Sequence, residues 1–248
     1  MAEEQVERNP WTRGGFIAAA GVVAVLVILG VVLTITGTRA DQPGTALPST
    51  VASTSDDVAA PEPSASSDGA DSVCGLDGQT LEGTLAAAPT AEWQYQGTTA
   101  YPTSPEFGPG EVTDEGVRSC YQRSPEGAVF AAANAVVQGT DPSTVEAWLD
   151  YFIADTSARK DVVTAAGNGD TSGTRAAVQG FRLLAYDGNS ATVDVAVRGS
   201  TDGEEVNLSM VYDLVWEDGD WKLVVTDPRA PVDVAFLPDL AGYSAWSA

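Results

Sequence analysis

The chain has 248 residues and a formal net charge of −23, and it contains no histidine. Residues 73–248 hold twenty-six acidic against nine basic residues, a net charge of −17. Such a surface repels phosphate backbones, so direct nucleic-acid binding is not expected. The lack of histidine removes the usual general base near neutral pH and the commonest metal ligand. Serine–histidine and cysteine–histidine catalysis are therefore excluded.

The first predicted element is a transmembrane helix over residues 14–37. These 24 residues carry no charge, and about 20 apolar residues suffice to cross the hydrocarbon core. A cleaved signal peptide would have a shorter apolar run of about 7 to 15 residues, so an uncleaved anchor is favoured. Trp11 and Arg13 precede the run and predict that residues 1–13 are cytoplasmic. We therefore expect a single-pass protein of the cell membrane with an extracytoplasmic C-terminal part.

Residues 38–72 are predicted to form a disordered linker. From position 41 they are rich in Pro, Ser, Thr, Ala and Asp and contain no aromatic residue. Such a segment cannot bury enough apolar surface to offset the entropy of ordering. A flexible chain of this length spans roughly 30 Å, so the linker would hold the folded part away from the bilayer.

The two cysteines, Cys74 and Cys120, both fall on the expected extracytoplasmic side, where oxidising conditions favour a disulfide. Closing a loop of about 47 residues would stabilise the fold by roughly 4 kcal/mol on the chain-entropy estimate. Two buried free thiols are the alternative. The wide spacing is unlike the C-x-x-C pair of thiol oxidoreductases, so a catalytic redox role is not expected.

Residues 73–123 are expected to form an irregular arm. Trp93, Tyr95, Tyr101 and Phe107 are interspersed with Gly and Pro in this segment. Such a composition favours packing by aromatic anchors over a regular element. The disulfide would attach the arm to the following domain.

Residues 124–248 form the predicted α+β domain, which begins with three helices. A capping serine, a proline at the first helical position and an early acid predict the first helix over residues 124–138. An Asp-Pro pair repeats the start signal for a second helix over 142–153. Residues 157–166 predict a shorter third helix before the Gly-rich loop 167–173.

Alternation of apolar and polar residues then predicts at least four antiparallel strands. They cover residues 181–186, 191–198, 206–216 and 221–225, with Asp-Gly turn signals between them. Helices that precede a curved antiparallel meander are expected to cover one face of the sheet.

Two resemblances to known families follow from these segments. The helical beginning, the long penultimate strand and the closing hairpin VYDLVWEDGDWKLVVTD (residues 211–227) resemble the nuclear transport factor 2-like cone fold. Most of residues 74–248 resemble a group of actinobacterial membrane proteins associated with conjugative and integrative element transfer genes. The segments that carry this second resemblance are Cys74-Gly75-Leu76, Trp93, Gly108-Pro109, Cys120-Tyr121, SPEGA at 124–128, Gly219-Asp220-Trp221 and GYSAW at 242–246.

The second resemblance implies a function that composition and spacing do not reveal. It implies a structural or accessory subunit of a conjugative, type IV secretion-like channel. The expected partners are the lipid bilayer and other proteins of the transfer apparatus. Oligomerisation is possible, but the helix over 14–37 has no apolar G-x-x-x-G pair to support it.

The sequence offers few candidates for catalysis. Arg182, Asp194 and Asp213 are the polar residues of most interest within the predicted strands, and a buried aspartate could serve as a general base. Both aspartates alternate with the apolar series, so we expect them on the opposite, solvated face of the sheet. No catalytic residue, metal site or cofactor is predicted.

Six aromatic residues of the predicted helices and strands leave two interpretations open. They could line a pocket for a lipid or another small apolar ligand, which would make the protein a cell-envelope carrier or sensor. They could instead fill the core of the cone, which is the interpretation we favour. The six are Trp148, Phe152, Tyr186, Tyr212, Trp216 and Trp221.

The C-terminal segment, residues 230–248, is apolar although it follows the predicted strands. Phe236, Leu240, Tyr243 and Trp246 are the candidate residues for docking a partner. The alternative is that the segment covers a sheet edge or the mouth of the cone. Packing within the chain is the favoured interpretation.

Overall fold

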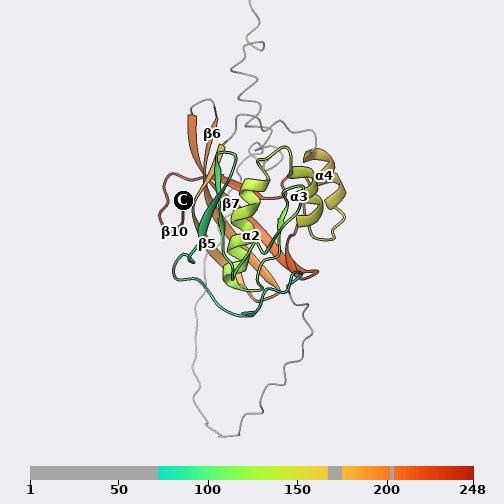
Figure 1. Ribbon diagram of the computed structural model, residues 1–248. Helices are drawn as coiled ribbons and strands as arrows, with labels where there is room; N and C mark the ends of the chain where they lie inside the picture. The colour runs from blue at the N-terminus through green and yellow to red at the C-terminus, as the bar shows by residue number, and fades with distance from the viewer. Residues whose placement is uncertain (1–71, 167–174, 202–203) are drawn as a thin grey trace, which may run out of the picture.

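The computed structural model describes residues 72–166, 175–201 and 204–248 (Figure 1). Its main sheet has six antiparallel strands in the order β10-β5-β6-β7-β8, and β9 pairs with β7 beside β8. Two further two-stranded sheets, β1-β2 and β3-β4, belong to the segment before the first described helix. The elements are β1 (Glu92–Gln96), β2 (Thr99–Thr103), β3 (Glu111–Val112), β4 (Arg118–Ser119), α2 (Pro125–Gln138), α3 (Val145–Phe152), α4 (Arg159–Ala166), β5 (Arg175–Tyr186), β6 (Ser190–Thr201), β7 (Glu204–Glu217), β8 (Asp220–Leu223), β9 (Asp233–Phe236) and β10 (Ser244–Ala245).

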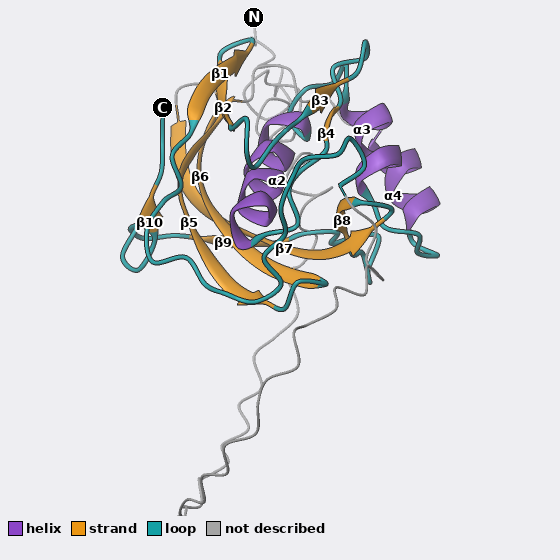
Figure 2. Cartoon of the chain, turned by 60° about the horizontal axis from the view of Figure 1, so that its bottom comes forward, coloured by secondary structure: helices purple, strands orange, loops and turns teal. Residues whose placement is uncertain are grey.

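Helix α2 lies in the concave curve of the sheet (Figure 2). The side chain of Ser124 caps it by accepting a hydrogen bond from the Gly127 N–H at 3.0 Å, and Pro125 occupies the first turn, as predicted. Every residue of α2 except Glu126 is buried. A Cβ at Gly127 would lie 1.9 Å from the Gln122 carbonyl oxygen, so only glycine fits where the preceding chain crosses the first turn.

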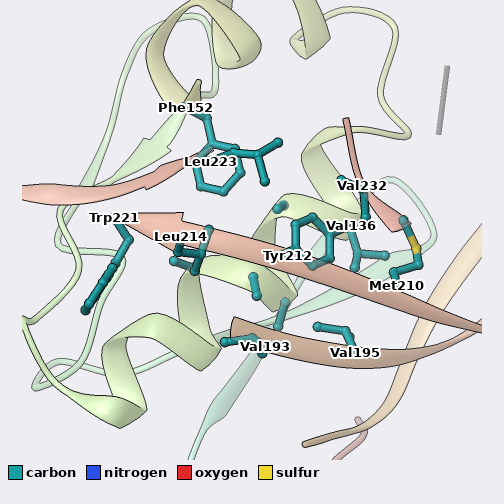
Figure 3. Packing of buried hydrophobic residues seen from close by; sticks show 14 of the residues in the cluster. Val136, Phe152, Val193, Val195, Met210, Tyr212, Leu214, Trp221, Leu223 and Val232 are labelled. Carbon is teal, nitrogen blue, oxygen red and sulfur yellow. The ribbon is translucent and has the colours of Figure 1, made fainter. Parts of the chain in front are cut away.

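The long strands β5, β6 and β7 provide the other half of the core. Alternation directs Val193 and Val195 of β6 toward α2, and the register places them opposite Tyr212 and Met210 of β7. Figure 3 shows these side chains together with Val136 of α2. Burying one such side chain contributes roughly 1.5–3 kcal/mol. The predicted strands and helices of this region are confirmed, with ends that differ by a few residues.

The predicted fold class is wrong, because the described chain is sheet-rich and lacks the expected helical layer. It contains ten strands but only three helices, of 14, 8 and 8 residues. Only α2 packs in the curve of the sheet, while α3 and α4 pack on each other beside β8 (Figure 2). Strand β2 shares the concave side with α2. The cone-fold assignment is therefore not retained.

The predicted membrane helix, residues 14–37, and all but the last residue of the predicted linker lie outside the described residues, as does the loop 167–173. No helix among the described residues is both long and apolar enough to cross a membrane.

The segment before α2 is more regular than expected. Residues 73–123 contain the hairpin β1-β2 and the short pair β3-β4 rather than an irregular arm. The predicted disulfide between Cys74 and Cys120 is confirmed, with their Cα atoms 5.8 Å apart. Gly110 packs directly on it, since a Cβ there would lie 2.7 Å from the Cys74 Sγ. The disulfide joins the two ends of this segment, and the Val73 N–H donates to the Gly219 carbonyl at 2.8 Å, so the disulfide lies at the joint where the segment meets the turn between β7 and β8.

Candidate functional site

The C-terminal segment 237–248, here called the strap, crosses from one edge of the main sheet to the other. It leaves β9, where the Leu237 N–H donates to the Asn207 carbonyl at 2.9 Å, and ends beside β5, where the Trp246 N–H donates to the Gln179 carbonyl at 3.0 Å. Between these points it passes over the face opposite α2, because Tyr243 hydrogen-bonds to Asp194 of β6. The strap thus covers a face that alternation alone would leave to solvent.

Trp246 attaches the end of the strap to the core. Its ring centroid lies 5.0 Å from that of Phe130 in α2, 5.5 Å from Phe181 in β5 and 5.6 Å from Trp93 in β1. The indole Nε1–H donates to the Pro89 carbonyl at 3.0 Å. One side chain near the C-terminus therefore joins the helix, the sheet and the arm.

The strap also closes a polar cluster around Asp194, whose side chain is fully buried. Its carboxylate accepts hydrogen bonds from Ser209 Oγ at 2.7 Å, from the Tyr243 hydroxyl at 2.7 Å, and from the Arg182 guanidinium, whose Nε lies at 3.2 Å. The hydrogen bonds that Arg182 donates to Asp194 raise the pKa of Arg182. The solvated position predicted for Asp194 is wrong, whereas Asp213 is exposed and accepts a bond from Thr192 at 2.8 Å.

A second buried carboxylate, Asp220, was not predicted as a functional or structural centre. It accepts hydrogen bonds from the main-chain N–H groups of Cys120 (2.7 Å), Tyr121 (2.9 Å) and Trp221 (2.9 Å), and from the Tyr151 hydroxyl (2.6 Å). Burial raises the pKa of Asp220, and these donors oppose that shift. The available signal in the sequence is the turn Gly219-Asp220-Trp221, which also carries part of the family resemblance.

Neither cluster has the arrangement of a general base. Both oxygens of each carboxylate are already bonded to protein donors, and both residues are buried. A general base must reach the proton it abstracts within hydrogen-bond distance. Here the carboxylates can stabilise the fold and position the strap and the disulfide joint.

The six aromatic residues proposed to line a pocket lie in or against the hydrophobic core. Trp148 stacks on Phe152 with ring centroids 5.0 Å apart. Trp221 meets Trp216 at 5.3 Å and Tyr186 at 5.9 Å. Tyr212 is buried among the β6 and β7 side chains (Figure 3). The arrangement favours core packing, and a ligand pocket formed by these residues stays a prediction.

A family model for a domain of unknown function, DUF8175, matches residues 53–245. The chain belongs to the DUF8175 family. The matched region runs from before the disulfide through β10, so residues 237–245 of the strap belong to the DUF8175 domain. Neither the comparison with curated proteins nor the comparison with solved structures gives a match.

The structure separates the four docking candidates of the DUF8175 domain into two pairs. Trp246 is buried and Tyr243 is half-buried and bonded to Asp194. Phe236, at the end of β9, is 64% exposed, and Leu240 is 36% exposed. The strap therefore packs within the chain at its end, whereas Phe236 of β9 and Leu240 of the strap are exposed to solvent.

The exposed pair lies beside a free edge of the sheet. The outer edge of β8 is covered by residues 153 and 154, since the Ala154 N–H donates to the Leu223 carbonyl at 2.9 Å. Strand β10 covers part of β5. Strand β9, in contrast, has no partner but β7 among the described residues. A free edge with an exposed aromatic side chain is the feature best suited to contact another protein.

Proposed function

We propose that this protein is a non-enzymatic, membrane-anchored structural or accessory subunit of a conjugative, type IV secretion-like transfer apparatus, and that its extracytoplasmic DUF8175 domain binds a partner protein along β9. The uncharged run 14–37 supports the anchor. The resemblance to conjugation-associated membrane proteins supports the apparatus. The free edge of β9 is the observation that carries the partner contact.

The backbone of β9 has hydrogen-bonding groups available on its outer side. The Leu237 N–H points toward β7, where it bonds to the Asn207 carbonyl. Because successive residues of a strand alternate in direction, the main-chain N–H and C=O groups of Val234 and Phe236 point away from β7. An extended segment of a partner could pair with them and extend the sheet.

Side chains around this edge indicate the chemistry of the partner. The exposed ring of Phe236 supplies apolar contact area, and exposed Asp233 and Asp239 flank it. An acidic rim around an apolar centre repels acidic proteins and speeds association with basic ones. The fitting partner is an extended segment with apolar residues and neighbouring lysine or arginine.

Crosslinking from defined positions in the native membrane tests this proposal. A photo-reactive phenylalanine derivative would replace Phe236, and Tyr95 of β1, which is 66% exposed, serves as a matched control position. We expect crosslinks from position 236 to a protein encoded with the transfer apparatus and none of that product from position 95. If position 236 yields only lipid adducts or no adducts, the proposal fails.

A transfer assay gives an independent measurement. We expect Phe236→Asp to lower the transfer frequency of the conjugative element by at least about tenfold, the change that corresponds to the loss of one apolar anchor of a partner contact. Tyr95→Asp should leave transfer unchanged. Equal effects of the two substitutions would show that Phe236 has no special role.

A further inference from the structure

A surface pocket of about 310 Å³ lies where the loop over residues 72–79 meets Arg123, away from the β9 edge. Arg123 is only 8% exposed. Its Nε donates to the Gly188 carbonyl at 2.8 Å and its Nη2 to Asn189 Oδ1 at 2.5 Å, both in the turn between β5 and β6. The turn thus fixes the guanidinium at the wall of the pocket.

The charge of Arg123 has no acidic partner in the part of the chain that the structure describes. Both of its hydrogen-bond acceptors are neutral oxygens, and its remaining neighbour of note is the ring of Trp216, 5.7 Å from the guanidinium carbon. Neither acceptor is a carboxylate, and within the described residues the side-chain hydrogen bonds of Arg123 come from Nε and Nη2, not from Nη1. Buried charges are normally paired, because an unpaired one loses hydration without compensation. An anion in the adjacent pocket would provide the missing partner.

The loop adds main-chain donors to the same pocket. Gly75 and Gly78 have φ angles of +76° and +84°, and these left-handed residues turn the chain around the pocket. Within the described chain, no main-chain N–H of residues 76–79 donates a hydrogen bond. Successive free N–H groups in such a turn form a concave site that suits an anion.

Asp77 restricts which anion fits. Asp77 lines the pocket and is exposed, and its carboxylate forms no ion pair with Arg123. A dianion such as phosphate would be repelled by this carboxylate. A molecule with a carboxylate at one end and an ammonium group near it would satisfy both charges. The volume is at the small end of ligand sites, which suits a small polar molecule rather than an acyl chain.

We propose that this pocket binds a zwitterionic amino acid or short peptide, with its carboxylate on Arg123 and the N–H groups of the loop, and its ammonium group on Asp77. The guanidinium can donate to both carboxylate oxygens, which fixes the orientation of the ligand. This site is independent of partner binding at β9, so either proposal can fail without the other.

Titration calorimetry on the purified full-length chain tests the proposal, with Trp216 fluorescence as a second readout. The probes are dialanine, its N-acetyl derivative, its C-terminal amide and inorganic phosphate. We expect dialanine to bind best, the N-acetyl derivative to bind about threefold to fivefold more weakly, and the amide and phosphate not to bind. No binding of dialanine, or binding of phosphate as tight as that of dialanine, would overturn the proposal.

Two variants assign the binding to the two side chains. Arg123→Gln should weaken dialanine binding by at least about 30-fold, whereas Arg229→Gln, at an exposed arginine, should have no effect. Because Arg123→Gln also removes bonds to the β5–β6 turn, Asp77→Asn provides a test that leaves the fold intact. It should weaken dialanine about threefold to fivefold and leave the N-acetyl derivative unchanged. Equal losses for both ligands would contradict the assignment of the ammonium group to Asp77.

Discussion

The two buried carboxylates of the main sheet, Asp194 and Asp220, differ in the groups that they hold. Both side chains are fully buried. Asp220 accepts from three main-chain N–H groups, two of which belong to Cys120 and Tyr121, about a hundred residues earlier in the chain. Among the described residues, Asp194 accepts only from side chains, one of which belongs to the strap. Asp220 thus fixes the path of the backbone, and Asp194 fixes the strap that covers one face of the sheet.

This difference has consequences for stability and for motion. A main-chain N–H that loses a buried acceptor has no other rotamer in which to find a partner, so the fold must rearrange or leave it unsatisfied. A side chain near the surface can turn toward water. Arg182 and Tyr243 are partly exposed, so they have this option. We therefore expect the disulfide joint around Asp220 to open only with global unfolding, and the strap to open separately.

The largest effect should come from Asp220→Asn. The amide keeps the size of the side chain but places an N–H₂ group against main-chain donors, which leaves buried N–H groups without an acceptor. We expect the free energy of unfolding to fall by about 4 kcal/mol, from orphaned donors that cost about 1–3 kcal/mol each. Urea unfolding followed by tryptophan fluorescence measures the change.

Asp213→Asn is the control for this substitution. Asp213 is an exposed aspartate of β7, so the same chemical change should alter stability by less than about 0.5 kcal/mol. A similar loss in both variants would mean that the main-chain bonds of Asp220 contribute nothing special, and the comparison of the two carboxylates would lose its basis.

A smaller effect is expected for Asp194→Asn. The amide oxygen can still accept one hydrogen bond, and the side chain of Arg182, 40% exposed, can be hydrated. Ser209 loses its buried partner. We expect a loss of about 2 kcal/mol in the free energy of unfolding, roughly half that of the Asp220 variant. If Asp194→Asn proves as costly as Asp220→Asn in the same urea experiment, the distinction between backbone and side-chain donors is wrong.

Tyr243→Phe sharpens the comparison by removing only the bond between the strap and Asp194. We expect a loss of about 1 kcal/mol, localised in the strap. Hydrogen exchange should accelerate at the Trp246 N–H, which bonds to the Gln179 carbonyl, and remain unchanged at the Trp221 N–H, which bonds to Asp220. Uniform acceleration at both positions would indicate that the strap does not open independently.

The elements that the sequence predicts well are those with local signals. The serine cap and proline of α2, the alternation of β6 and β7 and the cysteine pair depend on neighbouring residues or on composition, and the structure contains all of them. The two hairpins of the arm were missed because their strands have five or two residues and lie among Gly and Pro. Short strands carry too few residues for a period of two to be recognised.

Asp194 shows the limit of prediction from the sequence more clearly. Alternation assigned it to the correct face of β6, opposite the apolar series. Its burial depends on Tyr243, which lies 49 residues later and approaches only because the strap returns across the sheet. No periodic pattern encodes that return. The same holds for Asp220, whose partners lie on the far side of the disulfide loop.

The smallest predicted effect concerns a carboxylate outside both clusters, Asp141, in the turn after α2. Burial raises its pKa, but hydrogen bonds from Ser143 and from the Gln96 amide lower the pKa by more than burial raises it, so the net shift is downward. A carboxylate whose pKa is lowered in the folded state stabilises the fold at pH values above the ordinary carboxyl pKa of about 4. This stabilisation is lost as the pH falls through the pKa of the folded state. Asp141→Asn should therefore cost a few tenths of a kcal/mol at pH 7, about 0.5 at most because the group is largely solvated, and nothing near pH 2. Urea unfolding of both proteins from pH 2 to 7 measures this difference. A difference that stays constant or grows toward acid pH would show that the hydrogen bonds of Asp141 do not favour its ionised form.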